Sequence, residues 1–141
     1  MTDTEKALNI AKILCVESGL ELSYMVAKTR KREVLQVRQS CHYLIKKFTK
    51  LSLGSIGKLI GNLNYATVLH SCNTINNLLL TDKIFRSDLE HWENIVIDFI
   101  RYNKLKEAYN TEIKAYKVSK ALFRNKSACK RHGIDFKIQV I

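Results

Sequence analysis

The chain contains no proline, and this absence constrains its fold more than any other feature of the sequence. Proline interrupts helices more strongly than any other residue, and here apolar side chains recur at three- and four-residue spacing along most of the chain. Only five glycines punctuate this pattern. The sequence therefore predicts an all-α protein.

Local start and stop signals divide the pattern into segments. Thr2 and Glu5 have the spacing of a capping box, and Gly19 is suited to ending the helix that the box begins. We expect helices over residues 3–18, 21–26, 31–49, 53–60 and 65–80, then a long helix from residue 81 through residue 116. Residues 134–140 alternate apolar and polar side chains, which is typical of a short strand.

A short helix, a tight turn and a longer helix follow one another between residues 52 and 80. Ser52 is a suitable N-cap, and residues 61–64 are typical of a turn. This order predicts a helix-turn-helix. The outer face of the longer helix is expected to carry Tyr65, Thr67, His70, Ser71, Asn73, Thr74, Asn76 and Asn77. Such uncharged polar groups can donate to and accept from base edges.

The charge is concentrated in two blocks. The chain has 24 Lys and Arg against 13 Asp and Glu, a net charge of +11. Residues 27–60 hold nine basic side chains and one acidic one, and residues 101–141 hold eleven and three. This excess favours nucleic acid or an anionic membrane surface as partner, although a solvated basic face is the simpler alternative. For the second block, an extra nucleic-acid contact and a solubilising tail are equally good interpretations.

Other features disfavour several classes of function. No apolar run reaches the ~18 residues of a membrane-spanning helix, and the acidic N-terminus does not resemble a signal peptide. Cys15, Cys41 and Cys72 fall on apolar helix faces, which indicates core thiols in a cytoplasmic protein. We find no catalytic set, and we expect the four histidines on helix surfaces. The sequence thus predicts no enzyme activity, no cofactor and no metal.

We expect two parts in the chain, a helix-turn-helix domain over residues 1–100 and a basic C-terminal extension over residues 101–141. Four aromatic residues lie in the final long helix: Trp92, Tyr102, Tyr109 and Tyr116. They either complete the core, which we favour, or form a surface for a dimer or another partner.

Four separated motifs, in order, carry a resemblance to a known family. They are KTRKRE at residues 28–33, VRQ at 37–39, LSLGSIG at 51–57 and GNLNYATVLHSC at 61–72. Together they resemble the C-terminal, duplex-binding domain (domain IV) of the bacterial replication initiator DnaA. The resemblance covers about half of the chain. It implies a TrpR-like helix-turn-helix bundle, here with an extra C-terminal helix.

The resemblance also implies roles by position. The arginine matching Arg38 enters the minor groove, and the residues matching 52–55 offer backbone N–H groups to phosphate. Those matching residues 64–67 read base edges in the major groove. The residues expected at the DNA interface are Lys28, Arg30, Arg32, Arg38, Lys46, Lys50, Ser52, Leu53, Asn64, Tyr65, Ala66, Thr67 and His70.

The implied partner is double-stranded DNA, bound by a stand-alone, nucleoid-associated protein that acts in replication initiation or its regulation. The reading positions depart from the family pattern, however. Where the family has Arg-Asp-His-Ser/Thr, this chain has LNYA at residues 63–66, so an amide replaces an acid and a methyl replaces a hydroxyl. We therefore expect an altered sequence preference. The alternatives are a protein-interaction module that dimerises or binds a replication protein and, less favoured, binding to a membrane surface.

Overall fold

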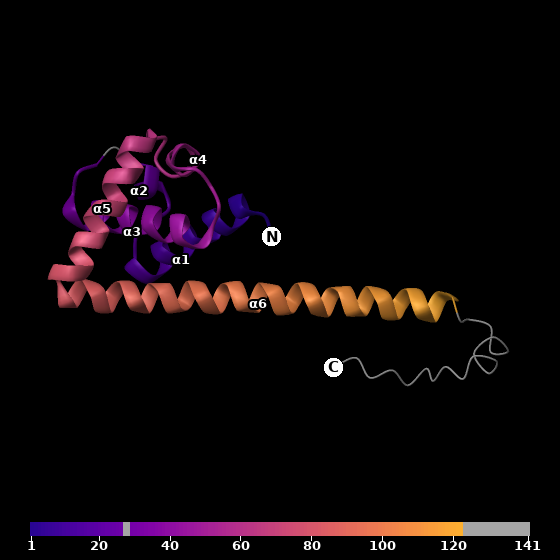
Figure 1. The fold of residues 1–141 in the computed structure, drawn as a ribbon. Helices are drawn as coiled ribbons and strands as arrows, with labels where there is room; N and C mark the ends of the chain where they lie inside the picture. The colour runs from indigo at the N-terminus through magenta and orange to yellow at the C-terminus, as the bar shows by residue number, and fades with distance from the viewer. Residues whose placement is uncertain (27–28, 123–141) are drawn as a thin grey trace. The chain divides into compact units, whose positions relative to one another are not determined.

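The computed structural model describes residues 1–26 and 29–122, within which the chain forms six helices and no strand (Figure 1). The helices are α1 (Asp3–Ser18), α2 (Ser23–Val26), α3 (Arg32–Phe48), α4 (Leu53–Leu59), α5 (Tyr65–Thr81) and α6 (Lys83–Leu122). The chain divides into two compact units, Met1–Ile100 and Arg101–Ile141. The predicted all-α class is confirmed, and the strand expected at residues 134–140 lies outside the described residues.

Helix α1 begins and ends at the predicted local signals. Thr2 Oγ1 accepts a hydrogen bond from the Glu5 backbone N–H (3.2 Å), and the Glu5 carboxylate accepts one from the Thr2 backbone N–H (3.1 Å). The capping box is therefore confirmed. Gly19 has a φ of +74°, and this left-handed conformation ends the helix as predicted.

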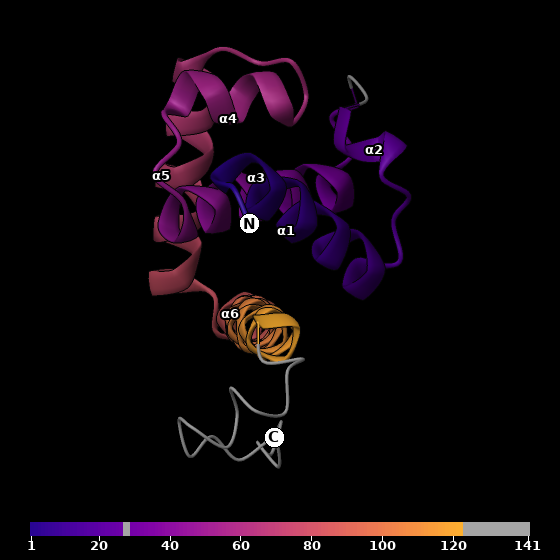
Figure 2. The same ribbon diagram turned by 90° about the vertical axis from the view of Figure 1, so that its right-hand side faces the viewer.

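The core of the first unit is centred on α3. This helix packs against both α1 and α5, and α4 packs against α5 (Figures 1 and 2). Fully buried side chains join these helices: Ile10 and Leu14 of α1, Leu44 and Ile45 of α3, and Ile75 of α5. Each contributes ~1.5–3 kcal/mol through the hydrophobic effect. Because α3 lies at the centre of these contacts, its packing holds α5 in place.

Three cysteines belong to this core. Cys15, Cys41 and Cys72 are free and buried, as predicted. Burial raises the pKa of each thiol, because the thiolate would lose its hydration. These thiols are therefore neutral packing groups. Cys129 lies outside the described residues.

The first part of α6 completes the core of this unit. Asp82 Oδ1 accepts a hydrogen bond from the Phe85 backbone N–H (3.1 Å) and so caps the start of the helix. Phe85, Leu89 and Val96 are buried, and Trp92 packs against the same core. The favoured prediction for Trp92, that it completes the core, is confirmed.

The tyrosines further along α6 are different. Tyr102 is 62% exposed and Tyr109 is 46% exposed, so the prediction that they complete the core is wrong. Helical spacing predicted the face on which they lie, but not whether another element covers that face. No helix in the described part of the chain is long and apolar enough to span a bilayer.

Candidate nucleic-acid interface

The close approach of α4 to the following turn depends on Gly57. The Leu63 backbone N–H donates to the Gly57 carbonyl oxygen at 2.8 Å. A Cβ atom added at Gly57 would overlap the Leu63 carbonyl oxygen and lie 3.2 Å from Val68 Cγ2. The absence of a side chain at residue 57 therefore sets the angle at which the chain leaves α4 and enters α5.

The turn and the start of α4 are fixed by their own backbone chemistry. Ser52 Oγ accepts a hydrogen bond from the Ser55 backbone N–H (3.2 Å), so the predicted N-cap is confirmed. Gly61 has a φ of +97° and Asn62 a φ of +50°. Glycine and asparagine are the residues that tolerate this left-handed region best, so the sequence suits a sharp reversal here.

Asn64 and Thr67 hold the first turn of α5. Asn64 Oδ1 accepts hydrogen bonds from the Thr67 backbone N–H at 3.0 Å and from Thr67 Oγ1 at 3.1 Å. Both residues were predicted to read bases, and the structure gives both a capping role. The side chains of Tyr65, Ala66 and His70 lie exposed beside this cap, and Tyr65 is 63% exposed.

The exposed face of α5 differs from the predicted one at Ser71. Asn73, Asn76 and Asn77 are exposed, as expected, whereas Ser71 is buried. The prediction for Ser71 is wrong because a hydroxyl is small enough to enter the core when it finds hydrogen-bond partners there. Its partners are the Thr67 carbonyl oxygen, at 3.0 Å, and a buried histidine of α3.

That histidine is His42, which is fully buried, so the expectation that all four histidines lie on helix surfaces is wrong. Its Nδ1 lies 3.1 Å from Ser71 Oγ, and its Nε2 lies 3.1 Å from the Ile60 carbonyl oxygen. A carbonyl oxygen only accepts, so Nε2 carries the proton. His42 therefore joins α3 to the end of α4 and to α5.

The environment of His42 favours the neutral ring. Burial lowers its pKa below the ordinary value, because the imidazolium would lose its hydration. The hydrogen bond to Ile60 acts in the opposite direction, and the nearby charge of Arg38 lowers the pKa further. Residues 38, 42 and 45 all lie on the buried side of α3, but helical spacing alone gave no signal that the histidine among them is buried.

Arg38, predicted to enter the minor groove, is only 7% exposed. Its Nη2 donates to the Tyr24 carbonyl oxygen at 3.5 Å, so the side chain lies between α3 and α2. Burial lowers the pKa of the guanidinium. A groove contact by Arg38 would require this side chain to leave the Tyr24 carbonyl.

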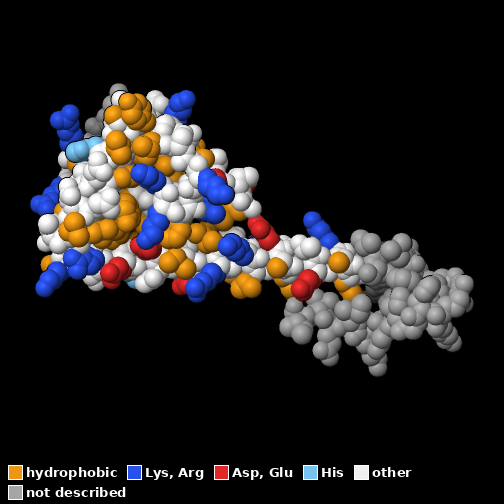
Figure 3. Space-filling view, in the orientation of Figure 1, with side chains coloured by type: hydrophobic (Ala, Val, Ile, Leu, Met, Phe, Trp, Pro, Cys, Tyr) orange, Lys and Arg blue, Asp and Glu red, His pale blue; other side chains and the backbone are white. Residues whose placement is uncertain are grey.

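The other predicted basic contacts are on the surface. Arg30, Arg32, Lys46 and Lys50 are all exposed, and Lys28 lies outside the described residues. On the face shown in Figure 3, Lys and Arg side chains are spread over the first unit, and acidic side chains are fewer. The remaining predicted positions, Ser52 and Leu53, form the exposed and half-buried start of α4.

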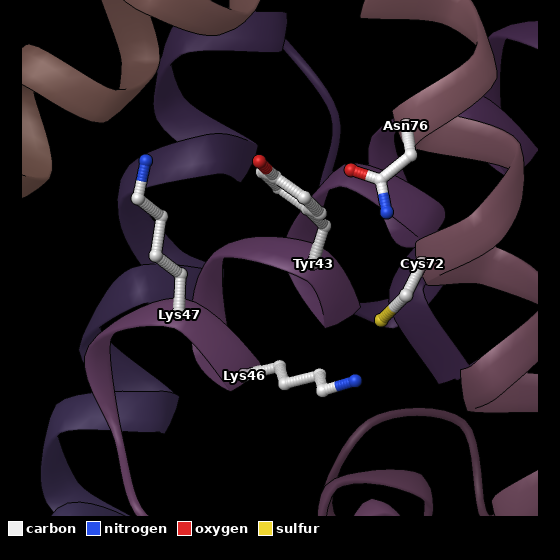
Figure 4. A pocket seen from close by; sticks show the side chains of 5 residues that line it. All are labelled: Tyr43, Lys46, Lys47, Cys72 and Asn76. Carbon is white, nitrogen blue, oxygen red and sulfur yellow. The ribbon is translucent and has the colours of Figure 1, made fainter.

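A shallow groove of about 320 Å³ runs between α3 and α5 (Figure 4). Its lining residues are Tyr43, Lys46, Lys47, Cys72 and Asn76. Lys47 Nζ lies 2.5 Å from Glu93 Oε1, and this hydrogen bond is the main cause of the raised pKa of Lys47. Lys46 extends into the space below Cys72 in this view. The groove thus places a cationic side chain beside the same helix that exposes Tyr65 and His70.

The described residues hold no cluster of three His, Cys, Asp or Glu side chains that suits a metal ion. What the geometry does supply is a short helix packed closely against a glycine-dependent turn, with the start of the next helix open to solvent. This arrangement defines a helix-turn-helix domain. Residues 8–75 match the family described as bacterial DnaA protein helix-turn-helix.

Three relatives are similar to a domain-sized part of this chain. The chain is 43% identical over 88 residues to the chromosomal replication initiator protein DnaA of Bacteroides thetaiotaomicron, and 47% identical over 88 residues to that of Bacteroides fragilis. It is 46% identical over 77 residues to the DnaA of Flavobacterium psychrophilum. These matches cover 62%, 62% and 55% of this chain, but only 19%, 18% and 16% of the respective relatives. The matching family is a helix-turn-helix domain rather than a catalytic one.

Proposed function

We propose that this chain binds double-stranded DNA through α4 and α5, in the context of replication initiation. The observation that carries the proposal is the start of α5. Asn64 and Thr67 cap the helix, His42 and Ser71 brace it from behind, and uncharged side chains remain exposed on it. A rigid helix that offers such groups suits the major groove. The names of the relatives support this context.

The proposed contacts divide into positioning and reading. Arg30, Arg32, Lys46 and Lys50 neutralise phosphates and fix the register of the domain on the duplex. Tyr65, Ala66 and His70 read base edges, with Asn64 and Thr67 contributing through the geometry of the cap. In this proposal Arg38 enters the minor groove only after its guanidinium leaves Tyr24.

We also propose that the base preference differs from that of the family's standard site. Ala66 offers a methyl group where the family has a hydroxyl, and Tyr65 offers a ring where the family has an imidazole. These groups favour apolar contact with a thymine methyl over the family's hydrogen bonds. Asn64 preserves the cap that an aspartate would make, so the change affects reading more than folding.

The test is binding to labelled duplexes, one with a DnaA box and one with the same bases scrambled, over a salt series. We expect binding whose logarithm falls linearly with the logarithm of salt concentration. The variant K46A/K50A should bind every duplex more weakly and with a shallower salt slope. The matched control is Lys12→Ala, which removes an exposed lysine of α1. Absence of duplex binding at low salt would overturn the proposal.

Selection from a random duplex pool then separates the two possible preferences. Recovery of the DnaA box would contradict the altered preference but retain DNA binding. Recovery of a different site would support the altered preference. Tyr65→Ala should then lose ~1–3 kcal/mol of the difference in binding free energy between that site and a scrambled duplex.

A second candidate function is a dimerising or protein-binding module. The observation that favours it is the exposure of Leu80 and Ile84, two large apolar side chains four residues apart. Light scattering coupled to size exclusion tests it directly. A dimer that the variant L80A/I84A dissolves would support this function, whereas a monomer at micromolar concentration would count against the dimer.

A further inference from the structure

An aromatic stripe lies on the second part of α6. Tyr102, Leu105, Tyr109, Ile113 and Tyr116 are three, four, four and three residues apart, so they share one face of the helix. Leu105 is 71% exposed, and both Tyr102 and Tyr109 are exposed as well. Ring faces left open to water in this way indicate a binding surface.

Basic side chains accompany the stripe. At 3.6 residues per turn, Arg101, Lys106 and Lys117 flank it, whereas Lys104 and Lys114 lie on the opposite face of the helix. Residues 101–117 contain five Lys and Arg against two Glu, a net charge of +3. The basic residues are Arg101, Lys104, Lys106, Lys114 and Lys117, and all of them are exposed. A second copy of this helix would bring the same positive charge against it, which is unfavourable. A polyanion would instead neutralise the charge and release its own counterions.

The aromatic rings distinguish between kinds of polyanion. Bases in a duplex are stacked on each other and offer no free ring face, whereas unpaired bases stack readily on tyrosine. Tyr102, Tyr109 and Tyr116 repeat every seven residues, a rise of about 10.5 Å along the helix. This rise is close to three steps of ~3.4 Å along one nucleic-acid strand, so successive rings can meet bases of the same strand.

We propose that the second part of α6 binds single-stranded DNA, with Tyr102 and Tyr109 stacking on unpaired bases and the flanking Arg101, Lys106 and Lys117 contacting phosphates. The basis is the juxtaposition of exposed rings at a constant repeat with a net positive charge. This activity goes beyond duplex recognition by α4 and α5 and does not depend on it. It gives the chain a second surface, for DNA in a different state.

The experiment measures fluorescence anisotropy of labelled oligo(dT) of 20 nucleotides, which forms no duplex, with the full chain at low and moderate salt. We expect salt-dependent binding that Y102A/Y109A weakens by about tenfold or more. The variant Y102F/Y109F should bind like the unmodified chain, because a phenylalanine ring still stacks. The matched control is Val16→Ala, which removes an exposed apolar side chain of α1. Circular dichroism checks that the alanine variant keeps its helix.

Several results would overturn the proposal. They are absence of oligo(dT) binding at low salt, equal binding by Y102A/Y109A, and a dimer that Y102A/Y109A dissolves, since that would assign the stripe to a second copy. Duplex binding is measured in parallel, with K46A/K50A as the reference variant. Loss of duplex binding with oligo(dT) binding retained would refute only the proposed function, and the converse would refute only this inference.

Discussion

Tyr65 in α5 and Tyr102 in α6 are exposed to almost the same extent, 63% and 62%, but their surroundings differ. Tyr65 follows a hydrogen-bonded cap on a helix braced by His42. Tyr102 stands in a stretch, residues 101–117, where no side chain is buried. A tyrosine on a helix that tertiary packing fixes in place suits recognition of DNA at one defined position. A tyrosine on a helix without such packing suits contact with a strand that can bind in several positions. Exposure alone therefore does not define the kind of recognition.

Among the variants that disturb the packing behind α5, Gly57→Ala should have the largest effect. The new methyl group would collide with the Leu63 carbonyl oxygen, so α4 must move away from the turn. We expect a loss of at least ~3 kcal/mol in the free energy of unfolding, measured by denaturant titration.

Gly54→Ala is the matched control, because nothing lies within 4 Å of the added methyl group. It should stabilise α4 by ~0.5–1 kcal/mol, as alanine favours helix over glycine. If both variants had equal stability, the role assigned to Gly57 would be wrong.

Replacing His42 should have the next largest effect. His42→Leu leaves the buried Ile60 carbonyl without its donor, and we expect a loss of ~1–3 kcal/mol. The pH dependence of stability sharpens the test. Because the folded pKa is lowered, the unfolded chain binds the proton more readily, so stability is full above the unfolded pKa of about 6.5 and falls as the pH drops below it.

This acid-side loss should be smaller in His42→Leu than in the unmodified chain. Denaturant titrations between about pH 5 and 8 measure it. An identical pH profile in His42→Leu would contradict the assignment.

Variants of Asn64 can separate its role as the cap of α5 from a direct role in reading bases. Asn64→Ala removes the cap of α5, at an expected cost of ~0.5–2 kcal/mol in the free energy of unfolding. Asn64→Ser keeps a capping oxygen and should be close to unchanged in stability. If both variants lose base discrimination equally, Asn64 reads DNA directly. If only the alanine variant does, it acts through the cap.

The smallest effect should come from the ion pair between α3 and α6. Lys47 and Glu93 meet near the surface, where water screens them, so the pair contributes ~0.2–1 kcal/mol. A double-mutant cycle with Lys47→Ala and Glu93→Ala measures the coupling, which should shrink as salt is added. A coupling energy well above this range would mean that water screens Lys47 and Glu93 less than the exposure of their side chains indicates.

The sequence predicted those parts of the fold that local chemistry determines. Thr2, Gly19 and Ser52 act through neighbours within a few residues, so their caps can be read from spacing alone. The helix-turn-helix was likewise foreseen from the order of a short helix, a turn and a longer helix.

Burial of polar side chains could not be predicted in the same way. His42 and Ser71 are 29 residues apart in the sequence, and each is satisfied only by the other and by backbone oxygens. Arg38 likewise finds its carbonyl on a separate helix. Such pairings depend on tertiary packing, which spacing rules do not contain. The contacts of the candidate interface residues with DNA stay predictions.

Ser71 has a single hydroxyl hydrogen, but two acceptors lie within its reach, His42 Nδ1 and the Thr67 carbonyl oxygen. With a neutral ring that hydrogen points to Nδ1, and the hydrogen bonds run in one direction from α5 through the imidazole to Ile60. A second proton on the ring would make Nδ1 a donor and turn the hydroxyl towards Thr67. One proton entering the core would thus reverse the hydrogen bond between His42 and Ser71, behind the start of α5, while the bond from Nε2 to Ile60 keeps its direction.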